Sequence, residues 1–438
     1  MVDETVMHND LVRKDSLASP RAIWHVAAIA LALFIGLFLV YWVSIPDHFN
    51  EIYNNRRFFD SDGEFITRQF YLGLTFTHNN HLLYHITARL LHQTGLGVVS
   101  AHKFLSVFFG ALGVSILYLG GRYWTGRSIP ALVAALFVGG SAGYWFFSSS
   151  IDTYVPHIAS GAAAIVAALV CLRTQRMAAY FAFCALLGLA FLFRTDGFLV
   201  AVTAIVLLDR PRSLWPRLAA LLAGGVLVGL IGYALLAWLF YGIPPTGAIA
   251  FAFPDRPEMA TGMWGRWANV DAGTLWLTVV NHVLYAVVMP GVDTTRSADL
   301  VAAYGQSWAG AIMPVLWTAF LVALIVRAAV GVLPGAGNRT SRHDRGWLAL
   351  LALAWFLPRV VFYTWWDPND PFLFACTSLP AFWLLWLLAL DPQRRETAAE
   401  QRSNDLPWFT LSATAFVAAL WLHNVLHLIL PMRAASVG

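Results

Sequence analysis

About eleven long apolar runs, separated by short charged stretches, make up most of this chain. A hydrocarbon core of about 30 Å takes roughly 20 apolar residues to cross as a helix, the conformation in which one run satisfies its own backbone hydrogen bonds. With 59% hydrophobic residues, 12% charged residues and a mean hydropathy of +0.64, the chain cannot present the surface of a soluble globular protein. The sequence therefore predicts an all-α, polytopic membrane helical bundle. The predicted spans are 22–44, 104–121, 129–148, 156–172, 178–193, 196–208, 218–241, 308–331, 347–364, 373–390 and 407–430.

Basic residues predict how the bundle is oriented. Arginine and lysine gather in alternate connections, and short cytoplasmic loops carry an excess of these residues. The polar segment 1–21 is therefore predicted to lie inside, and the C-terminus outside. No small-residue cleavage site accompanies the run at 22–44, so we expect a permanent anchor rather than a signal peptide. The inner connections carry Arg13, Lys14 and Arg21; Arg122 and Arg127; Arg173 and Arg176; Arg210, Arg212 and Arg217; Arg339, Arg342 and Arg345; and Arg394, Arg395 and Arg402.

Three parts are predicted after this cytoplasmic segment. Residues 22–241 form a transmembrane core that includes the outside loop 45–103, and 308–438 form the C-terminal transmembrane helices. Between them, the apolar stretch 274–291 would put the next cluster of inner arginines outside if it crossed the membrane. We therefore interpret 242–307 as an outside loop whose apolar part is re-entrant or lies at the interface.

The stretch FFDSDGEFITRQFYLGLTFTHNNHLLYHI, residues 58–86, is rich in ionisable side chains for so apolar a chain. Asp60, Asp62 and Glu64 occupy alternate positions at its start. Such carboxylates could share a proton, hold a divalent cation through their oxygens or supply a general base. They could also belong to a solvated loop that follows a membrane helix.

Histidines follow these acids at helical spacing. His78, His81, His85, Arg89 and His92 recur every three or four residues, which places them on one face of a helix. We expect an amphipathic juxtamembrane helix whose polar face meets lipid phosphates or an anionic substrate. His81 and His85 also have metal-ligand spacing, but no glutamate lies between them and no cysteine lies nearby, so a zinc site is not favoured.

Three motifs occur in order along the first half of the chain: DSDGEFITRQFYLGLTFTHNNHLLYH, IDTYVPH with Asp152 and Tyr154, and FLFRTDGFLV with Arg194. Together they resemble the GT-C superfamily of membrane glycosyltransferases, specifically the branch of the protein O-mannosyltransferases and their bacterial relatives. The resemblance covers roughly residues 20–210. The sequence departs from the family pattern in the NN of THNNH, where the family has two prolines, in an extra residue within the acidic motif, and at Asp152, where the family has glutamate.

The resemblance implies a glycosyltransferase of the plasma (inner) membrane. It would move a sugar, with inversion, from a polyprenyl-phosphate donor to a protein, lipid or glycan acceptor on the outer, periplasmic face. This chemistry needs a carboxylate that deprotonates the acceptor, cations for the departing phosphate and an apolar groove for the prenyl chain. The candidates are Asp60, Asp62 and Glu64 for catalysis; Arg194, His78, His81, His157 and Arg359 for the donor phosphate; and Asp152, Tyr154, Trp366 and Asp367 for the substrate. No cofactor is required, although the Asp60 and Asp62 spacing keeps Mg²⁺ or Mn²⁺ open.

The candidates also have structural interpretations. Arg194 and Arg359 are flanked by apolar residues, where a guanidinium group is costly unless it pairs or binds a ligand. Arg194 could instead form a salt bridge with Asp196 or Asp152. The histidines could be packed hydrogen-bonding residues, and Trp366 could be an interfacial anchor.

Two other functions use similar substrates. A flippase or transporter for a lipid-linked sugar would place ionisable residues at midmembrane in repeated halves, whereas the acids here gather at one face and no repeat is visible. An O-antigen ligase-like or polymerase-like enzyme would concentrate its key residues in a late outside loop, which here holds Arg256, Arg266, His282 and Arg296. No basic surface suited to nucleic acid is visible in the sequence.

Overall fold

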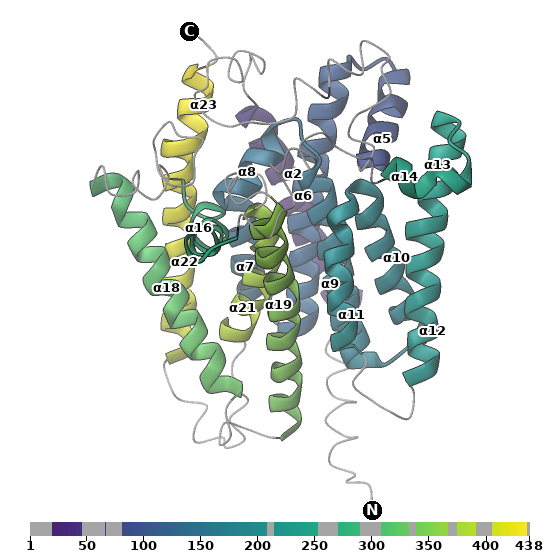
Figure 1. The fold of residues 1–438 in the computed structure, drawn as a ribbon. Helices are drawn as coiled ribbons and strands as arrows, with labels where there is room; N and C mark the ends of the chain where they lie inside the picture. Colours follow the sequence, from purple (N-terminus) through teal and green to yellow (C-terminus); the bar gives the residue numbers. More distant parts are fainter. Residues whose placement is uncertain are drawn as a thin grey trace, which may run out of the picture.

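The computed structural model describes residues 20–45, 66, 81–207, 214–252, 270–289, 308–332, 339–366, 375–390 and 405–435. Within these ranges the chain is helical, with short turns and no strand. The long helices lie alongside one another in a bundle (Figure 1). The predicted all-α architecture is therefore confirmed for the described part of the chain.

The first half of the chain forms the helices α2 (Pro20–Ser44), α5 (Leu82–Gln93), α6 (Val98–Thr125), α7 (Ser128–Gly140), α8 (Ala142–Ser149), α9 (Tyr154–Thr174), α10 (Met177–Phe193), η2 (Thr195–Ala201), α11 (Val202–Val206), α12 (Leu214–Gly224), η4 (Gly225–Ile231) and α13 (Gly232–Tyr241). The second half forms η5 (Pro245–Gly247), α14 (Ala248–Ala252), α16 (Ala272–Val280), η7 (Asn281–Tyr285), α18 (Trp308–Val332), α19 (Arg339–Trp366), η8 (Cys376–Ser378), α21 (Leu379–Leu390), α22 (Asp405–Asn424), η10 (Val425–Ile429) and α23 (Leu430–Ala435).

Each of the predicted spans falls on one of these helices or on consecutive helices. Six described helices are long and apolar enough to cross a membrane, or eight if each of two bent pairs is one span. Three shorter apolar helices accompany them, and one of the bent pairs is α7 with α8, which meet at 65°. The chain is thus a multi-pass membrane protein by the length and composition of its helices. The count of eleven spans and the orientation of the two termini stay predictions.

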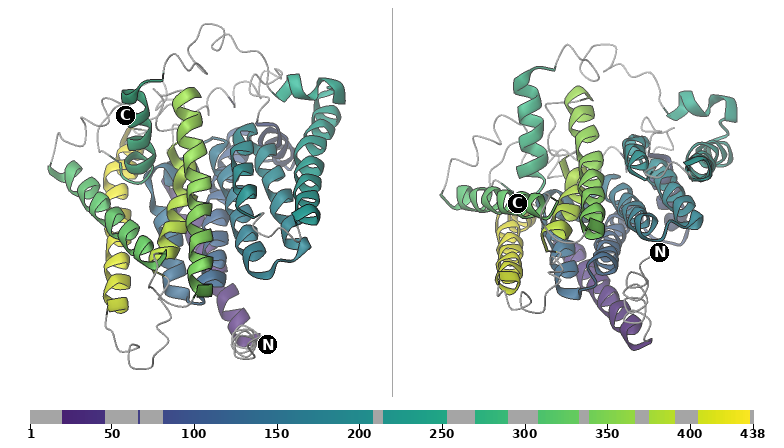
Figure 2. Two further views of the ribbon diagram at one scale, coloured as in Figure 1. Left: turned by 60° about the horizontal axis from the view of Figure 1, so that its bottom comes forward. Right: turned by 90° about the horizontal axis from the view of Figure 1, so that it is seen from below.

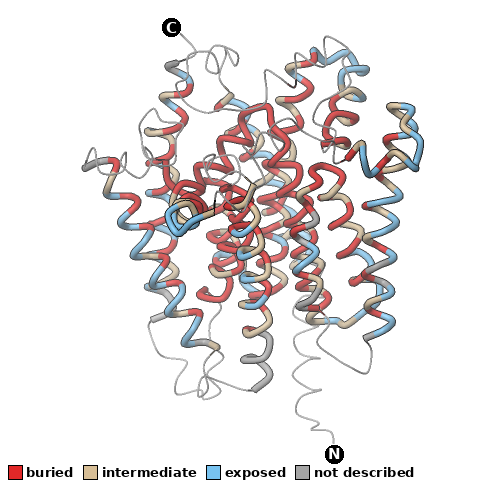
Figure 3. The backbone as a smooth tube through the Cα atoms, in the orientation of Figure 1, coloured by how far each residue is buried: buried red, intermediate tan, exposed pale blue. Residues whose placement is uncertain are grey.

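The most buried helices lie in the middle of the bundle (Figure 3). α8 and α21 bury nearly every side chain. α19 stands between α22 on one side and α12 on the other (Figures 1 and 2). Peripheral helices expose apolar side chains instead, among them Trp24 of α2, which is 75% exposed, and Val315 of α18, which is 65% exposed. Such an apolar outer surface is the one that a bundle presents to lipid.

α5 differs from the predicted surface helix. Its polar face is expected to meet lipid phosphates, but His81 and His85 are only 3% and 2% exposed, whereas His92 is exposed. The helix packs on α6, where the ring centroids of Tyr84 and His102 lie 5.5 Å apart. Two of the four described residues of the predicted polar face, His81 and His85, are therefore buried between helices, because α6 supplies polar and aromatic partners that the periodicity of α5 alone does not reveal.

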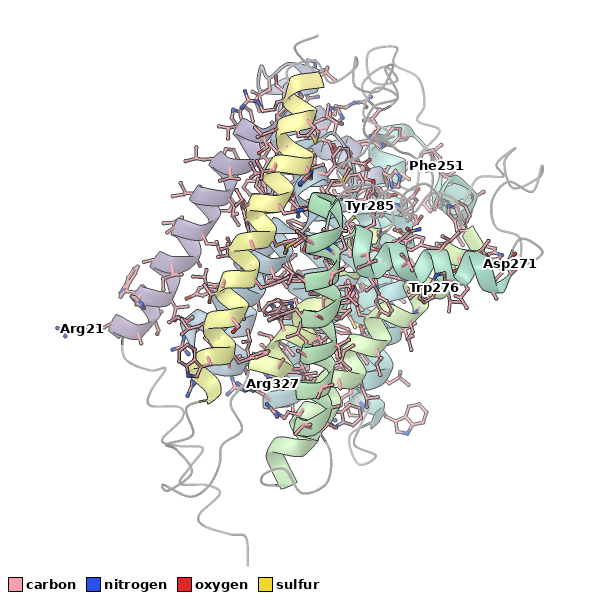
Figure 4. The ribbon with its side chains drawn as sticks, turned by 90° about the vertical axis from the view of Figure 1, so that its left-hand side faces the viewer. Arg21, Phe251, Asp271, Trp276, Tyr285 and Arg327 are labelled. Carbon is pink, nitrogen blue, oxygen red and sulfur yellow. The ribbon has the colours of Figure 1, made fainter. Side chains whose placement is uncertain are left out.

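α16 and η7 run across the bundle rather than along it, and we refer to residues 270–289 as the crosswise segment (Figure 4). Asp271 lies at its outer end and Tyr285 toward the interior. Asp271 caps α16, since its side chain accepts a hydrogen bond from the Thr274 backbone at 2.7 Å. The hydrogen bonds from Thr274 lower the pKa of Asp271. Trp276 is 64% exposed, as suits a helix at an interface.

The inner end of the crosswise segment is irregular backbone that is fully buried. It is held by Asn424, whose Oδ1 accepts from the Met289 backbone at 3.1 Å, and whose Nδ2 donates to the carbonyls of Gly140 and Val287 at 2.8 and 2.9 Å. The Ala142 backbone N–H adds a bond to the Val287 carbonyl at 2.9 Å. One amide thus joins the crosswise segment, the break between α7 and α8, and the end of α22.

Replacing Asn424 with leucine is expected to lower the free energy of unfolding by about 3 kcal/mol, because two buried carbonyls lose a donor and one buried N–H loses its acceptor. Equilibrium unfolding in mixed micelles measures this change. Thr414→Val on the same helix is the control, since the exposed Thr414 hydroxyl bonds only within α22, to Thr410 at 2.8 Å, and we expect a change within about 0.5 kcal/mol. Equal effects of the two changes would contradict the role of Asn424.

Candidate functional site

Buried ionisable side chains from distant parts of the chain meet where α8 ends, α9 begins and α10 ends. They come from the α8–α9 turn, the α10–η2 junction and α19. We term them the charge centre: Asp152, Arg194, Asp196, Arg359 and Tyr363. Asp152 and Arg359 are 0% exposed, and Arg194 is 7% exposed. Charges so deep in a membrane bundle are costly unless they pair or serve a ligand, so the charge centre is the candidate functional site.

Arg194 is fully engaged by neighbouring side chains. It lies in extended backbone between α10 and η2. Its Nε donates to Asp196 Oδ1 at 3.1 Å and its Nη2 to Oδ2 at 3.2 Å. Its Nη1 donates to Thr153 Oγ1 at 2.9 Å, and its guanidinium carbon stacks 3.9 Å from the centroid of the Tyr154 ring. The structural interpretation of Arg194, a salt bridge with Asp196, is therefore the arrangement that the structure holds.

Arg359 is the less satisfied of the two arginines. Its Nη1 donates to the carbonyl of Trp355 on its own helix at 2.9 Å, and the guanidinium stacks on the Trp355 ring at 3.9 Å. Its Nε and Nη2 have no hydrogen-bond partner among the described residues. The nearby charge is that of Asp196, which acts on Arg359 from electrostatic range. A buried guanidinium with unsatisfied N–H groups is suited to binding an anion.

The other predicted binding residues lie around these charges. Asp152 Oδ1 accepts a hydrogen bond from the Thr153 backbone at 2.6 Å. His157, 1% exposed, is hydrogen-bonded through Nδ1 with the Ala190 carbonyl at 3.2 Å, and the charges of Asp196 and Arg359 act on it. The structure thus brings Asp152, Tyr154, His157, Arg194 and Arg359 together.

Two more predicted residues are described but lie beside this set. His81 is at the start of α5, whose Tyr84 is near enough to Asp152 for electrostatic interaction. Trp366 ends α19 and stacks on Phe362, with centroids 5.9 Å apart and planes 9° apart. The predicted Asp60, Asp62, Glu64, His78 and Asp367 lie outside the described residues. Because both aspartates of the Mg²⁺ or Mn²⁺ prediction are among them, that prediction also falls outside the described part.

Two aromatic residues were not among the predicted site residues: Tyr363, which belongs to the charge centre, and His282, which packs on it. The Tyr363 hydroxyl donates to Asp196 Oδ2 at 2.6 Å, and the Tyr363 ring stacks on His282, with centroids 5.7 Å apart. Tyr363 follows Arg359 by one helical turn, and that i, i+4 spacing is a signal in the sequence that could have indicated it. His282 was singled out only for the competing ligase-like function.

The helices and the charge centre define a multi-pass helical membrane protein with an ionisable site enclosed in its bundle. No protein-family model and no curated protein sequence matches the chain. Among solved structures, it is similar to ArnT from Cupriavidus metallidurans bound to undecaprenyl phosphate, with a TM-score of 0.51 and 16% identity over 96% of this chain and 75% of that one. The apo state of the same ArnT gives a TM-score of 0.53 and 16% identity over 94% and 74% of the two chains.

Half of this chain also matches 34% of a chain in the Pmt1–Pmt2 protein O-mannosyltransferase complex from S. cerevisiae, at 18% identity and a TM-score of 0.41, which is too low to support a conclusion. ArnT is a GT-C glycosyltransferase. The predicted resemblance to the GT-C superfamily is therefore confirmed at the level of the fold, since this chain and ArnT share their overall helical architecture.

Proposed function

We propose that this chain is a GT-C-type glycosyltransferase that moves a sugar from a polyprenyl-phosphate donor to an acceptor, with inversion, on the outer face of the plasma membrane. The observation that carries the proposal is Arg359, a fully buried cation with two N–H groups that no described residue accepts. The similar ArnT structure is bound to undecaprenyl phosphate, which is a polyprenyl phosphate.

The chemistry explains why such a cation is kept. A buried charge without partners costs several kcal/mol, so a chain gains nothing from it in folding. A phosphate supplies the missing acceptors, and a guanidinium group can bind two of its oxygens at once. Arg359 would bind the donor phosphate before transfer and stabilise the polyprenyl phosphate that departs. Arg194, already paired with Asp196, would hold the site's shape rather than bind the phosphate.

The remaining candidates fit the other steps. Asp60, or Asp62, accepts the proton of the acceptor hydroxyl as its oxygen attacks the anomeric carbon and the bond from that carbon to the phosphate oxygen breaks. Glu64 positions the acceptor, which is a protein, lipid or glycan. His78, His81 and His157 are proposed phosphate or sugar ligands. The proposed substrate-binding residues are Asp152, Tyr154, Trp366 and Asp367. This scheme requires no cofactor, and Mg²⁺ or Mn²⁺ at Asp60 and Asp62 is an additional proposal.

The test needs no knowledge of the acceptor. Purified chain is incubated with a panel of polyprenyl-phosphate sugars and a periplasmic or membrane extract, and released polyprenyl phosphate is followed by mass spectrometry. We expect release from one donor, and a fall of about 10²–10⁴-fold in Asp60→Asn or Asp62→Asn, the range that a general base contributes. Donor binding should remain in that variant.

The alternatives predict different results. No release from any donor by folded protein, combined with movement of a lipid-linked sugar across vesicle membranes, would replace the transferase with a flippase. Release that needs diphosphate-linked glycans, and that is lost on changing Arg256 or Arg266 rather than the early aspartates, would favour the ligase-like enzyme.

A further inference from the structure

Tyr363 connects the charge centre with the crosswise segment. Its hydroxyl donates to Asp196 Oδ2 at 2.6 Å, and its ring stacks on His282 with planes 14° apart. His282 lies on η7, is 1% exposed, and is hydrogen-bonded through Nδ1 with the Ser378 hydroxyl. A chain of contacts therefore runs from the crosswise segment through Tyr363 to the pair of Asp196 and Arg194.

Asp196 interacts with two arginines, one through hydrogen bonds and one through its charge alone. Arg194 holds it by direct hydrogen bonds, whereas Arg359 feels its charge but donates its described hydrogen bond to Trp355. A carboxylate has about four acceptor sites. Tyr363 occupies one on Oδ2, next to the bond from Arg194 Nη2 at 3.2 Å. Oδ2 also accepts from Arg194 Nε at 3.3 Å, so three described hydrogen bonds meet at this oxygen, and loss of the shortest one, from Tyr363, would make room for the unsatisfied N–H groups of Arg359.

The spacing on α19 makes this competition geometric. Arg359 and Tyr363 are four residues apart on one helix, so they share a face, and both interact electrostatically with Asp196. The His282 ring packs on Tyr363 and fixes where that side chain lies. The Tyr363 hydroxyl is therefore held where it bonds with Asp196 Oδ2 beside the Arg194 guanidinium.

We propose that Tyr363, held by His282, is a positioning residue that keeps Asp196 on Arg194 and so leaves Arg359 available to bind a phosphate. This inference rests on the proposed function, because the phosphate is that of the polyprenyl donor. On this proposal, the crosswise segment affects donor binding because its His282 packs on Tyr363.

The test measures the affinity of the purified chain in nanodiscs for undecaprenyl phosphate. Tyr363→Phe is expected to raise Kd about tenfold, because Arg359 would then pair with Asp196, and His282→Ala about fivefold. His423→Ala is the matched control. It also removes a buried ring that holds the crosswise segment, but through a hydrogen bond with the Met289 carbonyl at 2.8 Å rather than through the stack on Tyr363. Its Kd should stay within about twofold of wild type.

A second comparison separates an effect of Tyr363 on Arg359 from an effect of Tyr363 on the stability of the fold. In an Arg359→Met background, Tyr363→Phe should change Kd by less than about twofold, because the cation it acts on is already absent. The inference is overturned if Tyr363→Phe lowers the melting temperature but keeps the wild-type Kd, or if it weakens binding equally in both backgrounds. Equal losses of affinity in His282→Ala and His423→Ala would remove the role of His282.

The same data distinguish this inference from the proposed function. Wild-type chain that binds no undecaprenyl phosphate would overturn both. Wild-type binding that depends on Arg359, together with unchanged binding in Tyr363→Phe, would leave the proposed function standing and overturn the inference alone.

Discussion

Replacing Arg359 with methionine is expected to weaken binding of undecaprenyl phosphate by at least about 100-fold while leaving the melting temperature equal to or above that of wild type. Two charge-assisted hydrogen bonds, each worth about 1.5–3 kcal/mol, would be lost from the complex, and about 1.4 kcal/mol corresponds to a factor of ten. Folding should not suffer, because a buried cation with unsatisfied N–H groups is replaced by an apolar side chain of similar volume. Titration with the lipid and thermal unfolding of the same preparations measure both quantities.

Arg173 offers the matched control. It lies at the far end of α9 from the charge centre, and its two terminal nitrogens donate to the carbonyls of Tyr123 and Trp124. Arg173→Met should therefore lower the melting temperature and leave lipid binding unchanged, the reverse of the result at Arg359. A fall in stability without a change in Kd for Arg359→Met would make Arg359 a structural residue and remove the main support for the proposed function.

Changing Asp196 to alanine is expected to lower the free energy of unfolding by about 3–5 kcal/mol. The substitution removes one partner of a buried salt bridge and leaves the Arg194 guanidinium without its counter-charge, which is the costly way to break such a pair. Equilibrium unfolding in mixed micelles gives the change in free energy.

The double variant Asp196→Ala with Arg194→Met tests whether the uncompensated charge of Arg194 causes the loss of stability. Because both charges are gone, it should recover most of the lost stability. A double variant as unstable as Asp196→Ala alone would mean that packing around Asp196, rather than the uncompensated charge of Arg194, accounts for the loss.

Hydropathy predicted the helices well because a membrane leaves each apolar run little alternative to a helix. The breaks within the runs were not predicted. The range 129–148 is expected as one span, but the structure bends it by 65° at Ser141, between α7 and α8. The backbone freed there is bonded by Asn424 and by the Val287 carbonyl, both far away in sequence. A break that depends on such distant partners leaves no local signature.

The sequence predicted the two arginines of the candidate site but not the contacts around them. Arg194 and Arg359 are identifiable in the sequence because a guanidinium inside an apolar run needs an explanation. Arg194 is paired by Asp196, two residues away, but the other side chains that hold this pair are distant in sequence. Arg194 bonds with Thr153, 41 residues away, and Asp196 with Tyr363, 167 residues away. The sequence therefore names both arginines as phosphate ligands, and the structure shows that Arg194 is paired with Asp196, whereas Nε and Nη2 of Arg359 have no described acceptor.

The Asn424 amide also constrains how the protein is made. The buried backbone at Val287 and Met289 bonds with a side chain that is synthesised 137 and 135 residues later. At about 5–20 residues per second, a ribosome needs roughly 7–27 s to add those residues. Until then the crosswise segment must keep its peptide groups in contact with water or with the translocation machinery, because lipid cannot solvate them. α22 therefore completes the packing of the crosswise segment only after about 135 further residues have been synthesised.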